Sequence, residues 1–442
     1  METLYYFYNN FYKYLKKKFN NFYQIKISFL KLYLIFSLFI ILVNFIYCFL
    51  YIQKFPEIVD SKNNYILENI GFNFGQVMKN LMDYNLLKAV YFDIDFYTSR
   101  MPLLPYFLKF LFNYFSHNFY IIHLIKNLFF SSIIFLLVIK ISAKQNFILT
   151  MIILFSIFYN PHNLWTSLSF NFEEGILNYL IIILYLLFIS DLRHKYLYLA
   201  FVISSLFFLK SSMFFLCFFL SVFFLILEFK KNNFGYTPLI LLLISSIIWG
   251  SYSYKKTGVF AFANKLSSFN SFTLNHAYNK KFNDLYPQKS PDLLTEEISE
   301  KLPKNIFTNE WQVDSFYLND SINYFKNNIL DVFKGLLKKI YVILFYLNKD
   351  SQITSSDNIV KNDIRLSNIP NKIIFVIFLI KLISCFFNNK LNRENIFLMI
   401  VISFYFLPYL IGFIYTRHCT SMYMLACLHL TYTFFIRNEK FL

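Results

Sequence analysis

A few ionisable side chains in this otherwise apolar chain could do chemistry. Charged groups at membrane depth are costly and are usually retained for a function. Five groups of polar residues fall near the ends of long apolar segments, and the topology argued below places all five on one side of a membrane. They are Asp60 with Tyr65, Arg100 in "YTSRMPLLPYFL", His162 with Glu173 and Glu174 in "NPHNLWTSLSFNFEEG", Lys210, and Arg417 with His418 in "YTRHC".

Asp60 is the first candidate acid. It follows the first apolar segment in "EIVDSKNNY". A carboxylate at that place could take a proton from a substrate hydroxyl, a contribution of about 10² to 10⁴ in rate. We predict Asp60 as a general base, with Glu57 as its nearby rival and Tyr65 as a substrate contact. The alternative is a solvated loop acid at a membrane exit.

Glu173 and Glu174 form a second acidic group, at the start of a predicted helix. The positive end of the helix dipole favours carboxylates there, and this structural role accounts for one of them. Two acids beside His162 also suit contact with an acceptor or a metal ion. We predict these three residues and Arg100 as binding residues, although Arg100 could instead anchor the following helix to lipid headgroups.

Four basic residues are predicted to bind a lipid phosphate: Lys126, Lys210, Arg417 and His418. The guanidinium of Arg417 suits bidentate phosphate binding. The alternative for Lys126 and Lys210 is that each extends its ammonium group to the headgroup region. For His418 the alternative is packing in the membrane interface.

Membrane helices must position these residues. The chain has 442 residues, of which 57% are hydrophobic and 15% charged, whereas soluble domains carry roughly a quarter charged residues. The apolar residues form long runs such as "LKLYLIFSLFIILVNFIYCFLYI" (30–52). A hydrocarbon core of about 30 Å requires about 20 such residues. The chain is therefore predicted to be an integral membrane protein.

About ten spans are predicted, and the basic residues of the short loops orient them. The N-terminal segment, the even-numbered loops and the C-terminal tail are basic or nearly so. We therefore expect both termini in the cytoplasm and a multi-pass protein of a bacterial inner (plasma) membrane. The predicted spans are 33–52, 119–140, 146–161, 175–190, 196–212, 213–229, 236–253, 371–388, 394–414 and 419–436.

Three regions follow from this topology. They are a membrane module over 1–253 that includes a first outer segment (53–118), a large outer segment (254–370), and C-terminal transmembrane helices (371–442). Residues 102–115 and 329–347 are predicted to form amphipathic helices in the membrane interface, with Lys334, Lys338 and Lys339 on one side of the second. The predicted fold is all-α, with about ten transmembrane helices and juxtamembrane helices in both outer segments.

Several classes of site are disfavoured. The five cysteines lie mostly inside apolar runs and include no CxxC pair, so neither a disulfide framework nor a metal site is indicated. Neither a Walker-type glycine loop nor an HExxH motif occurs, which disfavours a nucleotide-sugar donor. The net charge of +17 follows mainly from the cytoplasmic loops and does not indicate nucleic-acid binding.

The order of the motifs carries a resemblance. "EIVDSKNNY" follows the first span, "SRMPLLPYFLKFLF" opens a helix, and "NPHNLWTSLSFNFEEGILNYL" places Pro, Ser and an acid before a helix. "FFLKSSMFF" and "YTRHCTSMYML" follow. In this order the chain resembles the GT-C glycosyltransferases, in the branch of dolichyl-phosphate-mannose protein mannosyltransferases and aminoarabinose lipid A transferases. It departs from them in lacking the first Asp–Glu pair and in the Met101 that separates Arg100 from Pro102.

The resemblance implies an enzyme that transfers a sugar from a polyprenyl-phosphate donor to a hydroxyl of a glycan, lipid or protein acceptor at the outer face. Asp60 would be the base of an inverting reaction, and the cations would stabilise the leaving phosphate. No cofactor is implied, and a divalent cation held by Asp60 with Glu173 or Glu174 stays open.

Two other functions remain as alternatives. A polysaccharide polymerase or ligase of the O-antigen type would have a similar number of spans, but typically several arginines in its outer loops. A lipid or solute transporter would have charged residues at mid-membrane. Lys381 is the one mid-span charge, and it has no obvious acidic partner in the sequence.

Overall fold

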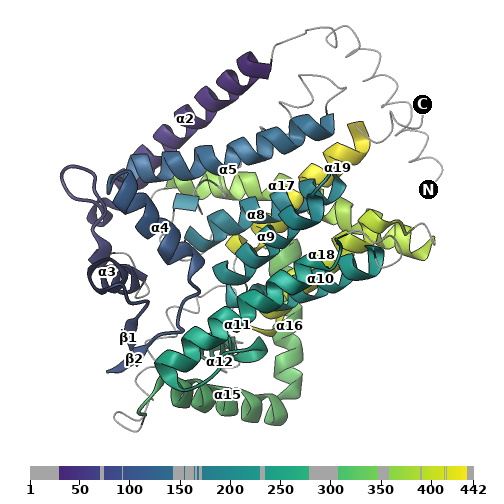
Figure 1. Cartoon of the computed structure of the whole chain (residues 1–442). Coiled ribbons are helices and arrows are strands. Elements are labelled where there is room, and N and C mark those ends of the chain that lie inside the picture. The colour runs from purple at the N-terminus through teal and green to yellow at the C-terminus, as the bar shows by residue number, and fades with distance from the viewer. Residues whose placement is uncertain are drawn as a thin grey trace, which may run out of the picture.

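The computed structural model is mostly helical, as the sequence predicts (Figure 1). It describes residues 29–69, 74–91, 93–142, 172–228, 234–277, 307–346, 358–388, 391–412 and 416–435, with residues 154, 164, 167, 168 and 414. The α-helices are α2 (Phe29–Lys54), α3 (Phe74–Tyr84), α4 (Leu103–Tyr114), α5 (Phe119–Ser142), α8 (Phe172–Ile189), α9 (Lys195–Leu209), α10 (Phe214–Glu228), α11 (Thr237–Thr257), α12 (Asn270–Ala277), α15 (Glu310–Asn327), α16 (Ile329–Leu344), α17 (Asn358–Phe387), α18 (Arg393–Ile411) and α19 (Thr416–Phe435).

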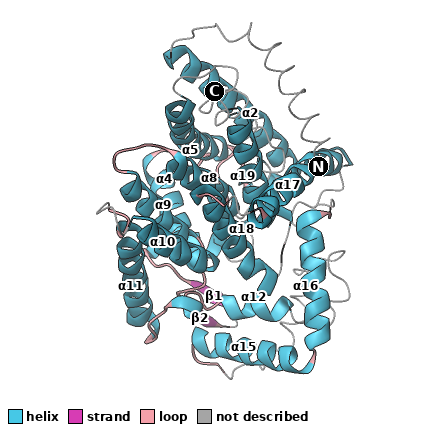
Figure 2. Ribbon diagram, turned by 90° about the vertical axis from the view of Figure 1, so that its right-hand side faces the viewer, coloured by secondary structure: helices cyan, strands magenta, loops and turns pink. Residues whose placement is uncertain are grey.

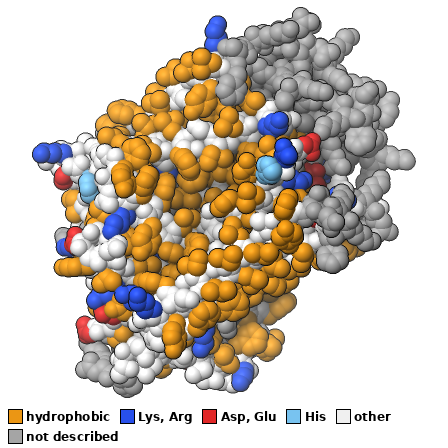
Figure 3. Space-filling model, viewed as in Figure 1, with side chains coloured by type: hydrophobic (Ala, Val, Ile, Leu, Met, Phe, Trp, Pro, Cys, Tyr) orange, Lys and Arg blue, Asp and Glu red, His pale blue; other side chains and the backbone are white. Residues whose placement is uncertain are grey.

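Six of the described helices are long and apolar enough to cross a membrane, and they lie in α2, α5, α10 with the turn before it, α11, α17 and α18. Their outward surfaces are apolar too: Leu38 on α2 and Ile248 on α11 are more than half exposed. Figure 3 shows a broad apolar band across this face, with most of the basic side chains towards its two sides. By length and composition of its helices, the chain is a multi-pass membrane protein.

The predicted spans coincide with described helices, except for 146–161, which lies outside the described residues apart from Leu154. The count of ten stays a prediction. One boundary differs clearly, because α17 begins at Asn358 and not near 371. The first half of this helix is polar, so it has no apolar run that would predict a membrane span. Pro370 also favours a helix boundary, since a proline usually ends or kinks a helix.

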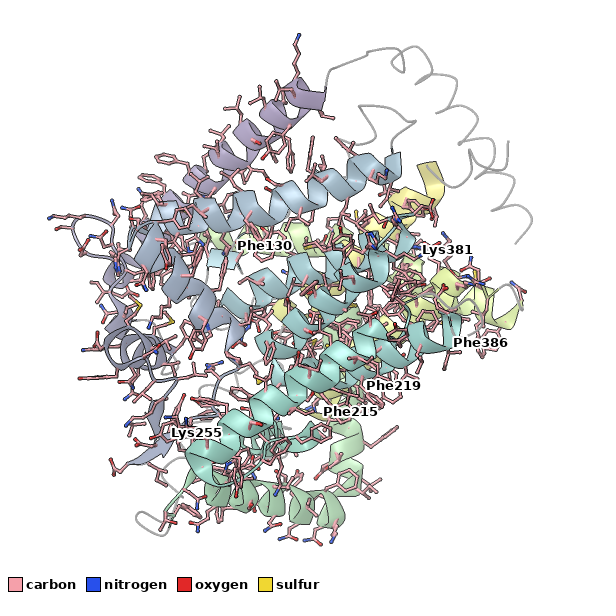
Figure 4. The ribbon with its side chains drawn as sticks, viewed as in Figure 1. Phe130, Phe215, Phe219, Lys255, Lys381 and Phe386 are labelled. Atoms are coloured by element: carbon pink, nitrogen blue, oxygen red, sulfur yellow. The ribbon has the colours of Figure 1, made fainter. Side chains whose placement is uncertain are left out.

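Helix α8 lies at the centre of the bundle (Figure 2). It packs against α5, α9 and α19, and nearly every described side chain from Glu173 to Leu187 is buried. A helix that is apolar all round must be buried in this way. One aromatic stack joins α5 to α8, in which Phe130 lies on Tyr179 at 5.3 Å. A second stack joins α10 to α18, in which Phe219 lies on Phe404 at 3.8 Å. Phe130 and Phe219 are labelled in Figure 4.

The first outer segment contains α3, a β-hairpin and α4. The predicted helix at 102–115 is confirmed as α4, with Leu104 and Leu108 buried and Tyr114 exposed. The hairpin was not predicted: β1 (Ala89–Tyr91) pairs antiparallel with β2 (Ile94–Phe96). Asp93 turns the chain at φ 61°, a conformation that Asp adopts more readily than most residues.

The second outer segment contains α12, α15 and α16, which lie together at the bottom of Figure 1. The predicted helix at 329–347 is confirmed as α16, but the prediction that its three lysines share one side was wrong. Lys334 is exposed and Lys338 is half-buried, whereas Lys339 is buried and its Nζ donates to Leu410 O at 3.0 Å. Lys339 therefore caps the last carbonyls of α18, where a cation is favoured.

Candidate functional site

Five of the predicted site residues meet at the start of α8. Glu173 and Glu174 open this helix, Lys210 is the residue that ends α9, and Arg417 and His418 lie in the first turn of α19. Because α8 packs between α9 and α19, helix ends that are far apart in sequence come together. We call Arg100, Glu173, Glu174, Lys210, Arg417 and His418 the ion cluster.

Lys210 joins the two acids. Its Nζ lies 2.8 Å from Glu174 Oε1 and 4.0 Å from Glu173 Oε2. The side chains of Lys210 and Glu174 are only 17% and 4% exposed. Charge interactions in such a water-poor place are much stronger than at a surface, so this ion pair fixes the end of α9 against the start of α8.

Arg100 reaches Glu173 from the first outer segment. Its Nη1 lies 3.4 Å from Glu173 Oε1, and its side chain is 23% exposed. The residues around it in the chain, Thr98, Ser99 and Met101, are buried. The backbone is thus held firmly while the guanidinium extends toward α8 and forms the most exposed ion pair of the cluster.

His418 and an unpredicted residue, Tyr409 of α18, close one side. His418 Nε2 lies 3.5 Å from Glu174 Oε1, and its ring stacks on Tyr409 at 4.3 Å between centroids. Lys210 Nζ lies over the same tyrosine ring, 5.5 Å from its centroid, which adds a cation–π attraction. The ring of Tyr409 therefore contacts both basic groups that approach Glu174 Oε1.

The six named members of the cluster carry more positive than negative charge. Arg417 is 6% exposed and interacts electrostatically with Glu174. Arg100, Lys210 and Arg417 thus face two carboxylates, before any proton on His418 is counted. Glu174 Oε2 is buried and makes no hydrogen bond to the described residues. Native proteins seldom leave such an oxygen unsatisfied, so this oxygen keeps an unused capacity to accept a hydrogen bond among the described residues.

Close packing below the cluster holds α8 in place. A Cβ at Gly175 would lie 2.8 Å from the Cα of Ser167, so only glycine lets this backbone approach. One turn further along, Asn178 accepts a hydrogen bond from the Ser421 hydroxyl on α19. Such polar contacts between helices give membrane bundles their directional packing.

Among the described residues, Asp60 makes no contact with the ion cluster. It is exposed, and its Oδ1 accepts hydrogen bonds from the backbone N–H groups of Lys62 and Asn64, each at 2.8 Å. The Asn64 side chain donates to Oδ2 at 3.1 Å. The Asn64 backbone N–H, ahead of the other donors, holds the pKa of Asp60 below its usual value. This geometry is that of an Asx turn, and a carboxylate held this way is a weak base.

Tyr65 and Lys126 belong to a separate buried chain of hydrogen bonds. Tyr65 OH lies 2.7 Å from His123 Nε2, and His123 Nδ1 lies 3.1 Å from Lys126 Nζ. Lys126 Nζ also donates to Ser167 O at 2.6 Å. These hydrogen bonds join the first outer segment to α5 and to Ser167, which packs against Gly175. Lys126 is therefore anchored inside the protein and does not extend to headgroups.

The remaining predicted residues have no place in the described cluster. Glu57 has an exposed side chain, and His162 lies outside the described residues. In the part of the chain that the structure describes, no group of three or more His, Cys, Asp or Glu side chains could hold a metal ion. The acids at the start of α8 are paired with Lys and Arg.

The sequence reasoning missed several buried polar residues. His123 lies one turn before Lys126, and this i, i+3 pair of basic residues in an apolar helix was a usable signal. Tyr185 OH donates to Glu394 Oε1 at 2.6 Å, and His429 Nδ1 lies 3.1 Å from the same oxygen. No sequence signal linked these three helices, because the contacts depend on how α8, α18 and α19 pack.

Comparison with known proteins gives no assignment. No protein-family model matches the chain, and neither a curated protein nor a solved structure matches it. The fold and the ion cluster define a class, a helical multi-pass membrane protein with a buried cationic site at helix ends. Its function has to be argued from that site.

Proposed function

We propose that this protein is a membrane glycosyltransferase that moves a sugar from a polyprenyl-phosphate carrier to an acceptor hydroxyl. The observation that carries the proposal is the ion cluster, in which two carboxylates and three cations meet at the predicted outer ends of the helices. A reaction of this kind needs a base for the hydroxyl and positive charge for the leaving phosphate.

The cations match the leaving group. Arg100, Lys210 and Arg417 exceed the two acids in charge, so an anionic phosphate would balance the cluster. Electrostatic stabilisation of this kind is strongest where water is excluded, and Lys210 and Arg417 are largely buried. The apolar surfaces of the surrounding helices suit the polyprenyl chain.

Glu173 is the proposed base. Its side chain is more exposed than that of Glu174, at 11% against 4%, and its ion pairs with Arg100 and Lys210, at 3.4 and 4.0 Å, are both longer than the 2.8 Å pair of Glu174 with Lys210. It can therefore exchange a partner for a substrate hydroxyl more readily. Glu174 holds Lys210 and His418 in position. Asp60, which the sequence suggested as the base, is assigned a structural role, in which it accepts the hydrogen bonds of its Asx turn.

Turnover of a labelled polyprenyl-phosphate sugar by membranes that contain each variant tests the proposal. Removing a general base typically costs about 10² to 10⁴ in rate, and we expect such a loss for Glu173→Gln. Asp60→Asn should retain activity, because an asparagine oxygen can still accept the turn hydrogen bonds.

The opposite pattern, with Asp60→Asn inactive and Glu173→Gln active, would return the role of base to Asp60. Wild-type membranes that form no glycosidic bond with any such donor, but move it across the bilayer, would replace the transferase with a transporter. Lys381, the mid-span charge that favours a transporter, donates to Thr433 Oγ1 at 2.7 Å. It is labelled on the right-hand side of the bundle in Figure 4.

A further inference from the structure

Arg100 is the one member of the ion cluster that does not lie at the end of a membrane helix. It sits between β2 and α4, in a short connection over residues 97–102. Something outside the bundle must therefore fix its backbone. The contacts around this connection lead to α15, more than two hundred residues further along the chain.

Glu310, the first residue of α15, makes those contacts. Its Oε2 accepts hydrogen bonds from the Thr98 backbone N–H and the Thr98 hydroxyl, each at 3.1 Å. It also accepts one from the Ser268 hydroxyl at 2.7 Å. A single oxygen thus ties α15 to two other segments, one of which carries Arg100 two residues later.

Further hydrogen bonds close the same joint. The Ser268 backbone N–H donates to Thr98 Oγ1 at 3.2 Å, and Ser267 Oγ donates to Ser99 O at 3.4 Å. Beside them, Phe96 packs with Val313 and Tyr317 of α15 in a small buried cluster. Phe96, Thr98 and Ser99 are therefore each held by contacts with the second outer segment.

Glu310 is unusual for a residue with a purely structural role. It is 1% exposed, and its neighbours in the joint are neutral donors. A buried carboxylate is costly unless it is fully hydrogen-bonded, and Glu310 Oε1 is without a hydrogen bond to the described residues. A neutral side chain would fill the same space with a smaller free-energy cost of burial. The carboxylate is therefore explained by the stronger hydrogen bonds that it accepts from Thr98.

We infer that Glu310 is a positioning residue, which holds the 97–102 connection so that the guanidinium of Arg100 reaches Glu173. The second outer segment thereby controls the geometry of the ion cluster from contacts to Thr98 and Ser99, two residues and one residue before Arg100. The effect on catalysis rests on the proposed function, but the positioning itself does not.

The matched control lies one turn along the same helix. Asp314 is also buried, at 3% exposed, and accepts a hydrogen bond from the Ser271 backbone N–H at 3.2 Å. Its contacts are to α12 and not to residues 97–102. Truncating Asp314 therefore disturbs the same helix to a similar degree and leaves the Arg100 connection bonded.

The direct test uses wild type, Glu310→Ala and Asp314→Ala in proteoliposomes. Labelling of Arg100 by phenylglyoxal and hydrogen exchange of residues 97–101 are read by mass spectrometry. We expect both to become faster in Glu310→Ala, by about tenfold or more, and to stay unchanged in Asp314→Ala. No change in Glu310→Ala, or an equal change in both variants, would overturn the inference. If Glu310→Ala does not fold, Glu310→Gln is used with the same expectations at smaller size.

A second arm measures transferase activity. Misplacing a reacting or charge-stabilising group by about 1 Å can cost on the order of a hundredfold, so we expect a fall of about ten- to a hundredfold in kcat/KM for Glu310→Ala. In an Arg100→Ala background the same change should have almost no further effect. An additive loss would show that Glu310 acts by another route. An inactive wild type would reject the proposed function, while the labelling arm would still decide whether Glu310 positions Arg100.

Discussion

Replacing Lys210 by methionine should weaken the packing of the bundle more than any single surface change. Methionine keeps the length and apolar stem of the lysine but removes the ammonium group. Glu174 then loses its closest cation, at 2.8 Å, and Glu173 loses its second, at 4.0 Å. Two carboxylates would remain side by side in a place where one of them is only 4% exposed.

The size of the effect follows from the burial of the pair. Removing one partner of a buried ion pair typically costs about 3 to 5 kcal/mol, because the other charge is left uncompensated. Lys210 is 17% exposed and Arg417 and His418 remain nearby, so we expect about 2 to 4 kcal/mol. The double variant Lys210→Met/Glu174→Gln should recover part of this loss, since it removes both charges of the pair.

The assay compares thermal inactivation of purified protein in detergent, followed as the fraction that stays monodisperse after heating. Lys195→Met is the matched control, because Lys195 lies at the opposite end of the same helix and is partly exposed. A lysine at a helix N-terminus contributes little or is slightly unfavourable. Equal midpoints for Lys210→Met and Lys195→Met would refute the view that the ion cluster holds α9 against α8. So would a double variant that is no more stable than Lys210→Met.

Two further outcomes follow from the contacts. Gly175→Ala should destabilise the protein by about 1 to 3 kcal/mol, because its Cβ would lie 2.8 Å from the Ser167 backbone; an unchanged thermal midpoint would contradict this packing. Burial raises the pKa of Asp314 above its ordinary value of 3.8, so the folded state holds this proton more tightly than the unfolded state. Its contribution to stability is present below that ordinary pKa and is lost as the pH rises through the raised folded pKa. The thermal midpoint of Asp314→Asn should therefore rise relative to that of wild type as the pH rises through this window. Parallel plots of thermal midpoint against pH for the two proteins would show that Asp314 ionises as it does in the unfolded chain.

Much of the helical framework could be predicted, because a membrane span leaves a long apolar run that depends on no other part of the chain. The start of α17 could not, since its polar first turns carry no such run. The β1–β2 hairpin was missed for a similar reason. Its six strand residues are too few for an alternating pattern to stand out from the surrounding aromatic sequence.

The charged residues of the candidate site could be recognised in the sequence, but which acid lies among the cations could not. Lys210, Glu174 and Arg417 were recognisable because a charge at the end of an apolar run is expensive. Asp60 satisfied the same rule, yet its hydrogen bonds are all local. Sequence position shows that a group lies near the membrane surface, but it does not show whether that group turns inward. Packing of α8 between α9 and α19 decides that, and it assigns the central place to Glu173 and Glu174.

The ion cluster has two tasks that oppose each other. Helices in lipid gain little from apolar contact with one another, so the charges at the ends of α8, α9 and α19 help to hold the bundle together. A phosphate ligand would compete for the same cations. The ion pair between Arg100 and Glu173 can be broken with the smallest loss of free energy. It is the most exposed pair of the cluster, and its distance of 3.4 Å is long for an ion pair. Arg100 also sits on a connection that the second outer segment holds through Glu310. A substrate could therefore draw Arg100 from Glu173, and so free the proposed base, while Lys210 and Glu174 keep the helices joined.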